Sequence, residues 1–191
     1  MDYVLLLPGQ GSQRVGMGKD LAETFPVSRA VFEAVDEAVG NAVSALAFNG
    51  PSDELTRTHN AQVALLAHSA AAWAVIGDVV KPTLKAAAGH SLGEFSAYHV
   101  AGALDAADAA RIVRRRGELM FEQGTQRPGT MAAVLGVLSE SIDNICDRAS
   151  SEGAVVVPAN FNSAEQVVIS GEIAGVERAM QLARGAICGP E

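Results

Sequence analysis

Apolar residues in the first half of the chain form short continuous runs and longer stretches with helical spacing. The runs Val4–Leu7 and Leu84–Ala88 have the length of a buried strand, although the second is rich in alanine and weak in strand propensity. The longer stretches predict three helices: Leu21–Val39 with an early break at Pro26, the uncharged run Asn60–Gly77, and the stretch from Leu104 to Met120. Strands that alternate with helices in this way predict an α/β fold.

After Gly129 the pattern changes to shorter elements. It predicts a strand, a helix, two strands and a second helix, over Met131–Leu138, Ser139–Ser151, Ala154–Val157, Gln166–Ser170 and Glu172–Arg184. This β-α-β-β-α order is the ferredoxin-like order without its last strand. The remaining stretch, residues 186–191, is short and interrupted by Gly189-Pro190, so it does not supply that strand. We therefore expect a larger subdomain over residues 1–124 and a smaller α+β subdomain over residues 125–191.

Composition restricts the class of protein. The 191 residues are 49% hydrophobic and 19% charged, which is typical of a folded globular chain and not of a disordered one. The net charge of −8 disfavours nucleic acid as a partner. The run Asn60–Gly77 approaches membrane-spanning length, but it is rich in alanine and carries Gln62, His68 and Ser69, so we expect a buried helix and no membrane association.

The remaining features of composition concern compartment and metals. The chain opens directly into its first apolar run, without the basic region of a signal peptide. Cys146 and Cys188 lack the spacing of metal ligands, and we expect reduced thiols, a cytoplasmic location and no metal site.

A Gly-x-Ser-x-Gly stretch, Gly89-His90-Ser91-Leu92-Gly93, lies between the second apolar run and a helix-like run. Glycines two residues to either side of a serine allow a sharp strand-to-helix turn that exposes its hydroxyl. The start of the helix then places the backbone N–H of Leu92 where it can face an oxyanion. The same pattern also arises by chance in a chain with 19 glycines, so other features must support a nucleophilic serine.

Two further motifs contain polar side chains near predicted element ends. The loop Pro8-Gly9-Gln10-Gly11-Ser12-Gln13 follows the first strand, where open α/β folds bind ligands. Its glycines match neither the Gly-x-Gly-x-x-Gly spacing of dinucleotide-binding loops nor the Walker pattern with its lysine. Four arginines, Arg111, Arg114, Arg115 and Arg116, lie on the third helix. Consecutive helical residues point about 100° apart, so the last three cannot face one partner. A solvated surface is the ordinary interpretation for any one of them.

Taken together, these motifs resemble the malonyl-CoA:acyl carrier protein transacylases, the acyltransferases of fatty-acid synthesis. The resemblance rests on motifs that occur in family order over essentially the whole chain: Pro8–Gln13, Gln62 in Ala-Gln-Val-Ala-Leu, Gly89–Glu94, Arg116-Gly117-Glu118-Leu119-Met120, Gly129–Val134 and Asn160-Phe161-Asn162-Ser163. It implies an incomplete α/β-hydrolase-like large subdomain joined to the small ferredoxin-like subdomain.

The resemblance also implies a role for individual residues. Ser91 matches the nucleophile that takes malonyl from coenzyme A, as an ester, and passes it to the thiol of acyl carrier protein. Gln10 and Leu92 match the residues whose backbone N–H groups form the oxyanion hole. Arg116 matches the arginine that holds the malonyl carboxylate by two contacts, and Gln62 matches a glutamine of the pocket. Coenzyme A is then a substrate, and no cofactor is expected.

The chain also departs from the family pattern. The family's catalytic histidine belongs to a Pro-Val-Ser-x-x-Phe-His-Ser segment after the small subdomain, and no part of these 191 residues matches it. His90 precedes the serine but does not match the general base, and nothing in the sequence ties His59, His68 or His99 to Ser91. A serine without a positioned base is a weak nucleophile, so we expect impaired activity. We also expect an unpaired sheet edge and an uncovered apolar face.

Alternatives remain open at this point. The chain could be a non-catalytic acyl-carrier or coenzyme A-binding remnant, or a serine hydrolase with an unidentified base. Phe121 stands where the family often has glutamine, which can alter the pocket wall. Acyl carrier proteins are acidic, so the helix from Arg111 to Arg116 is a candidate docking surface on an acidic chain.

Overall fold

The computed structural model describes residues 2–150 and 154–187. The chain forms an α/β fold with two compact units, Met1–Glu122 and Gln123–Glu191. The division falls two residues before the subdomain boundary expected between residues 124 and 125. Each unit has its own hydrophobic core, so each is described separately.

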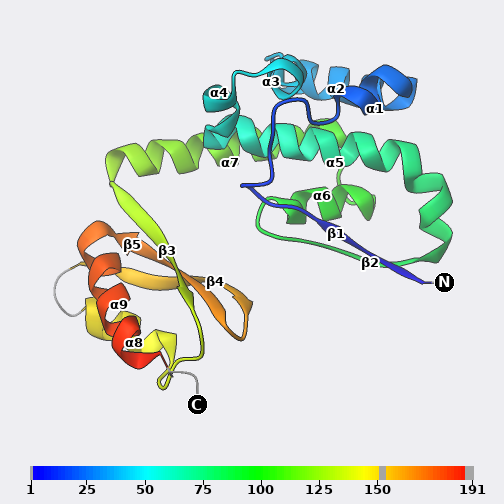
Figure 1. The fold of residues 1–191 in the computed structure, drawn as a ribbon. Helices are drawn as coiled ribbons and strands as arrows, with labels where there is room; N and C mark the ends of the chain where they lie inside the picture. The colour runs from blue at the N-terminus through cyan, green and yellow to red at the C-terminus, as the bar shows by residue number, and fades with distance from the viewer. Residues whose placement is uncertain (1, 151–153, 188–191) are drawn as a thin grey trace. The chain divides into compact units, whose positions relative to one another are not determined.

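The first unit places seven helices around a pair of parallel strands within the described residues (Figure 1). Strand β1 (Tyr3–Leu7) pairs with β2 (Leu84–Gly89), and Leu7 lies opposite Gly89 at the ends of the two strands. The helices are α1 (Lys19–Thr24), α2 (Pro26–Val39), α3 (Val43–Asn49), α4 (Ser52–Thr56), α5 (Thr58–Val80), α6 (Gly93–Val100) and α7 (Ala106–Gln126), with a 3₁₀ turn η1 (Lys81–Thr83) before β2. The break expected at Pro26 is confirmed, because this proline begins α2, where its missing N–H is not needed.

Helix α5 is the centre of this unit. Its small side chains allow α2 and α6 to pack closely, and nine of its residues from Ala61 to Ala71 are buried. The segment Thr58–Thr83 is long and apolar enough to cross a membrane by length and composition alone, but half of its most apolar window is buried inside the unit. A core helix passes the same test, and the packing of α5 is that of a core helix.

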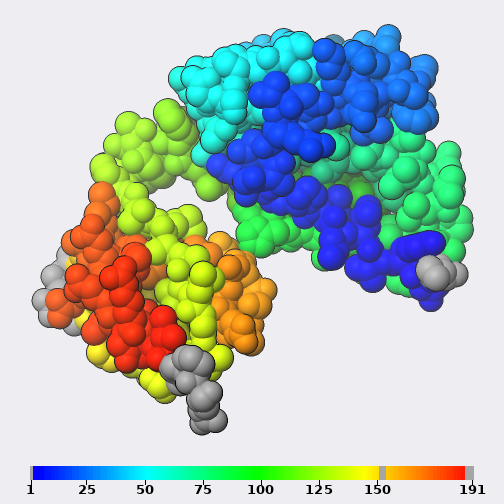
Figure 2. Space-filling model, viewed as in Figure 1, coloured from blue at the N-terminus to red at the C-terminus, as the bar shows by residue number. Residues whose placement is uncertain are grey.

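The strand pair has one face against the helices and one open face. Val4 is 61% exposed and Leu6 is 75% exposed, while Leu7 is buried. Figure 2 shows this N-terminal segment, in dark blue, at the surface of the first unit. Parallel strands are ordinarily covered on both faces. Here, among the described residues, β1 and β2 pair only with each other, so each strand has one free edge. Val4 and Leu6 leave one apolar side of the pair exposed.

The second unit is a three-stranded antiparallel sheet in the order β3-β5-β4, with two helices packed on it (Figure 1). Its elements are β3 (Gly129–Leu135), α8 (Ile142–Ser150), β4 (Val156–Ser163), β5 (Gln166–Glu172) and α9 (Ile173–Ala186). Beyond α9, Ile187 forms a single antiparallel bridge with Leu138. Ser151 and residues 188–191, on which some sequence expectations fall, lie outside the described residues.

Strand β4 is the main error in the predicted elements. The sequence predicted Ala154–Val157, whereas the strand runs to Ser163 and includes Asn160 and Phe161. Its polar residues are accommodated because β4 pairs with β5 across a tight hairpin, with irregular register at Pro158/Asn160 and at Phe161/Ser163. Cross-strand pairing here outweighs the weak strand propensity of asparagine and proline.

Candidate active site

The turn between β2 and α6 holds Ser91 in a strained conformation. Strand β2 ends at Gly89, α6 begins at Gly93, and Ser91 has φ of 54°. It is the one non-glycine residue with positive φ among those described. A left-handed conformation is costly for a residue with a Cβ atom, and such strain is concentrated at functional sites. The sharp strand-to-helix turn expected from the Gly-x-Ser-x-Gly pattern is therefore present.

Three glycines are needed for the close packing of this turn. A Cβ atom on Gly89 would lie 1.9 Å from the carbonyl carbon of Gly93, and one on Gly93 would lie 2.3 Å from the carbonyl oxygen of Leu7. A Cβ atom on Gly9 would lie 2.5 Å from the carbonyl oxygen of His90. All three clashes are with backbone atoms, which cannot move aside cheaply. The loop after β1 and the serine turn are thus in direct backbone contact.

Two backbone donors border the serine turn. Leu92 is fully buried in the core, which anchors the residue that follows the serine. Gln10 lies in the loop after β1, which is closed by bonds from Ser12 Oγ to the Gly9 carbonyl at 2.7 Å and from the Gly11 N–H to Gln13 Oε1 at 2.8 Å. Within residues 2–150 and 154–187, the backbone N–H groups of Gln10 and Leu92 donate no hydrogen bond. Neither N–H group is therefore committed to an acceptor within these ranges.

The Arg116 guanidinium connects α7 to the serine turn and to α5. Its Nη2 donates to Ser91 Oγ at 2.9 Å, and its Nη1 donates to Gln62 Oε1 at 2.5 Å. Gln62 is fully buried, and its Nε2 lies 3.4 Å from Gln10 Oε1 and 3.3 Å from Met120 Sδ. The structure therefore brings together five side chains that the sequence placed in four separate motifs.

Arg116 differs from its neighbours in lacking a carboxylate. Arg111 pairs with Asp108, Arg114 with Glu118, and Arg115 with Glu118 and Glu122. No ion pair is found for Arg116 in the part of the chain that the structure describes. A half-buried guanidinium held by neutral groups retains its ability to bind a carboxylate in a planar, two-point manner. This site can thus take an anionic group next to the Ser91 hydroxyl.

Sequence reasoning missed two residues of this site. The ring of Phe95 lies 5.8 Å from the Arg116 guanidinium carbon, and Met120 contacts Gln62. Phe95 lies in the first turn of α6, four residues after Ser91, and Met120 follows Arg116 by one turn on α7. Neighbours on the same helix face share surroundings, so helical spacing from the two matched residues was the signal that could have found them.

The four histidines lie in different surroundings. The Nδ1 of His90 lies 2.9 Å from the position that a Cβ atom would take on Gly9, so its ring packs against that loop. His59 stacks edge-on with Phe121 at 5.3 Å, and burial, followed by the charge of Arg114, lowers its pKa. His99 Nδ1 lies 3.1 Å from the carbonyl oxygen of Leu104.

Within the described ranges, no group of three His, Cys, Asp or Glu side chains could hold a metal ion.

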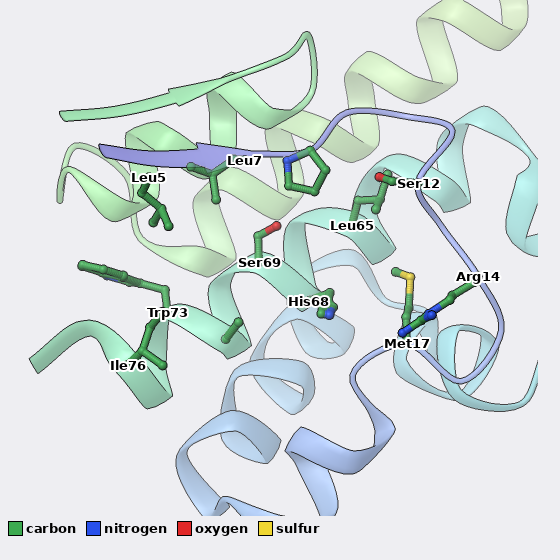
Figure 3. A pocket seen from close by; sticks show the side chains of 12 residues that line it. Leu5, Leu7, Ser12, Arg14, Met17, Leu65, His68, Ser69, Trp73 and Ile76 are labelled. Atoms are coloured by element: carbon green, nitrogen blue, oxygen red, sulfur yellow. The ribbon is translucent and has the colours of Figure 1, made fainter. Parts of the chain in front are cut away.

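A separate cavity of about 340 Å³ lies between β1 and α5, and Ser91, Gln62 and Arg116 do not line it. Leu5 and Leu7 of β1 face Trp73 and Ser69 of α5 across it (Figure 3). His68 also lines this cavity, and burial lowers its pKa. The cavity is mostly apolar and belongs to the incompletely covered core beside β1, whereas the convergence of polar groups is at Ser91.

Comparisons with known proteins identify the family of the chain. Residues 4–186 match the family described as the acyl transferase domain. The chain is 45% identical over 180 residues to the malonyl CoA-acyl carrier protein transacylase of Bacillus subtilis (strain 168), covering 94% of this chain and 56% of the relative. It is 43% identical over 186 residues to the enzyme of the same name from Escherichia coli (strain K12), covering 97% of this chain and 58% of the relative.

Solved structures show the same similarity. An acyl carrier protein S-malonyltransferase from Vibrio cholerae has a TM-score of 0.87 at 42% identity, over 97% of this chain and 60% of that one. A type II PKS acyl-carrier protein in complex with its malonyl-transacylase matches with a TM-score of 0.87 at 41% identity, over 97% of this chain and 60% of that one. The chain thus spans between 56% and 60% of the length of these proteins. On this evidence the chain belongs to the acyl transferase domain family.

Proposed function

We propose that this chain carries the serine-ester site of a malonyl transferase, which moves malonyl from coenzyme A to acyl carrier protein in fatty-acid biosynthesis. The observation that carries the proposal is the Arg116 guanidinium, which lies 2.9 Å from Ser91 Oγ and has no carboxylate partner among the described residues. A cation held beside a serine in a strained turn can bind an acyl group that ends in a carboxylate. The family match and the names of the relatives support the same assignment.

The transfer takes two steps with balanced chemistry. Ser91 Oγ attacks the thioester carbonyl carbon, its proton leaves, the C–S bond breaks, and coenzyme A departs as a thiol once protonated. The N–H groups of Gln10 and Leu92 would stabilise the oxyanion in this step. The phosphopantetheine thiol of acyl carrier protein then attacks the serine ester, takes the malonyl group and returns the proton to Ser91. No metal or redox group enters either step.

Arg116 and Gln62 would determine which acyl group is accepted. Arg116 donates one N–H to Ser91 Oγ and another to Gln62 Oε1. A malonyl carboxylate can take over the donor aimed at Ser91, while buried Gln62 keeps the guanidinium in place. Acetyl has no group for this donor. Because a hydrogen bond to a charged group contributes about 1.5–3 kcal/mol, we expect a malonyl preference of about 10- to 150-fold.

A general base for Ser91 is the part of the mechanism that the described residues do not supply, because the side chain hydrogen-bonded to Ser91 Oγ is the cationic Arg116. By resemblance, the general base is a histidine from a segment that these 191 residues do not match. We therefore propose that the 191 residues alone form the serine ester slowly, with the oxyanion hole and Arg116 providing the residual catalysis. His90 is not assigned a role as base.

The docking surface for acyl carrier protein stays a prediction. Arg114 and Arg115 are paired with Glu118 and Glu122, so this helix presents less free positive charge than the sequence indicated. The relative solved with an acyl-carrier protein supports such a partner for this chain. Charge reversal at both arginines, with carrier binding as the readout, remains the test.

We further propose how the two units correspond to subdomains. The parallel pair β1-β2 with its helices represents part of an α/β-hydrolase-like large subdomain, supported by the strand-serine-helix turn. The second unit represents a ferredoxin-like subdomain without its last strand, supported by its β-α-β-β-α order and its β3-β5-β4 sheet. A cytoplasmic location agrees with the free, buried thiol of Cys146, whereas Cys188 lies outside the described residues.

The first experiment is intact mass spectrometry of the chain after incubation with malonyl-CoA. We expect a malonyl adduct that is absent from Ser91→Ala and reduced in Arg116→Ala, whereas an acetyl adduct from acetyl-CoA is not reduced by Arg116→Ala. An adduct that persists in Ser91→Ala would refute the assigned nucleophile. Malonyl-CoA binding by calorimetry without any adduct would indicate the binding remnant. Coenzyme A and free malonate released without an accumulating adduct would indicate a hydrolase.

A further inference from the structure

The guanidinium of Arg116 is constrained in two different ways. Its edge donates to Gln62 Oε1 and Ser91 Oγ, which fixes positions within its plane. Its central carbon lies over the ring of Phe95, 5.8 Å from the ring centroid. This distance is within the range of a cation–π contact. The two hydrogen bonds act only at the edge of the group, and the ring of Phe95 adds a contact at its centre that opposes movement away from the serine turn.

The ring of Phe95 is itself held firmly. It lies in the first turn of α6, whose N–H at Phe95 bonds to the Leu92 carbonyl at 3.0 Å. Phe95 is half-buried, packs against the main core of the first unit, and meets the ring of Tyr98 edge-on at 6.3 Å. The helix that carries the ring also begins at the serine turn. The ring therefore moves with Ser91 and keeps the guanidinium in register with the nucleophile.

This arrangement has a consequence for the ligand. An arginine side chain has several rotatable bonds, and holding one in place costs conformational entropy. A guanidinium that is already positioned binds a carboxylate without that cost, which is the general benefit of preorganisation. A ligand without a carboxylate gains nothing from it. Loss of the ring should thus weaken the binding of a dicarboxylic acyl group selectively.

We infer that Phe95 is a positioning residue, which holds Arg116 against the Ser91 turn and so contributes to the preference for an acyl group with a free carboxylate. The inference rests on the proposed function, because it assumes that Arg116 receives the malonyl carboxylate. Phe95 is not a catalytic residue, since it acts only through Arg116.

The test measures binding, so that it does not depend on turnover. In a Ser91→Ala background, the affinities of malonyl-CoA and acetyl-CoA are measured by calorimetry, and their ratio is compared among variants. Phe95→Leu and Phe95→Met remove the ring face, Phe95→Tyr keeps it, and Phe25→Leu removes a partly exposed aromatic ring elsewhere in the first unit as a control. We expect the first two to lower the ratio about two- to fivefold, and the last two to leave it unchanged.

A double-mutant cycle separates positioning from general damage. If Phe95 acts through Arg116, then Phe95→Leu changes the ratio in the Arg116 background but not in an Arg116→Ala background. The same ratio in Phe95→Leu, Phe95→Met and the parent would overturn the inference, provided that the parent prefers malonyl-CoA. A parent without that preference would overturn the proposed function first, and the inference with it. Phe95→Met keeps the test decisive if Phe95→Leu does not fold.

Discussion

The strain at Ser91 makes a prediction about stability that is independent of catalysis. Its φ of 54° places a residue with a Cβ atom in the left-handed region. Ser91→Ala and Ser91→Gly both delete the hydroxyl that accepts from Arg116 at 2.9 Å. The two variants differ only in the Cβ atom. Their difference in unfolding free energy therefore isolates the strain.

The magnitude follows from two opposing effects. Relief of the left-handed conformation favours the glycine variant by about 1–2 kcal/mol. The greater freedom of glycine in the unfolded chain opposes this by about 0.4–1 kcal/mol. We expect Ser91→Gly to be more stable than Ser91→Ala by about 1 kcal/mol. For a chain of this length, that corresponds to a Tm higher by about 2–4 °C.

Urea and thermal unfolding followed by tryptophan fluorescence measure this difference. Trp73 is the single tryptophan of the sequence and lies on α5, so it reports on the unit that carries Ser91. Ser96→Gly and Ser96→Ala form the matched control, since Ser96 lies in α6 and its helical conformation should favour alanine by about 1 kcal/mol. The reasoning fails if Ser91→Gly is no more stable than Ser91→Ala while the Ser96 pair behaves as expected.

Three further predictions concern packing and ionisation. Gly93→Ala should lower the free energy of unfolding by about 2–3 kcal/mol, because its Cβ atom would lie 2.3 Å from a β1 carbonyl oxygen. Gly124→Ala in α7 is the control, since a Cβ atom there meets nothing within 4 Å and should cause no such loss. Equal urea midpoints for the two variants would contradict this prediction. Burial raises the pKa of Cys146 to about 11, so little of this thiol is present as the reactive thiolate at pH 8. Peptide-level mass spectrometry should find slow iodoacetamide alkylation of Cys146 in the folded chain and fast alkylation in urea. Similar rates in the two conditions would contradict this prediction. Burial lowers the pKa of His68 below its ordinary value of 6.5. As the pH falls through 6.5, the unfolded chain therefore binds a proton at this histidine before the folded chain does, and the free energy of unfolding should decrease. Urea unfolding at several pH values should show a smaller decrease for His68→Gln.

Local patterns in the sequence were sufficient for much of the fold and for the turn that holds Ser91. A long uncharged, alanine-rich run located the core helix α5, and Pro26 marked the junction of α1 and α2. The glycines around Ser91 indicated a sharp turn, because backbone conformation depends on residues that are neighbours in sequence. The rotation of about 100° per residue correctly indicated that Arg114, Arg115 and Arg116 do not all face one partner. Arg114 and Arg115 share Glu118, whereas Arg116 donates to Ser91.

The tertiary structure alone decided which groups meet. Gln62, Ser91 and Arg116 come from three helices or their ends, and their hydrogen bonds depend on how α5, α6 and α7 pack. The same holds for Phe95 under the guanidinium, and for the extension of β4, which depends on pairing with β5. Such contacts join residues that are far apart in the chain, and no periodic pattern records them. The sequence by itself thus determined the elements and the strained serine, whereas long-range packing determined the surroundings that make its hydroxyl and Arg116 one site.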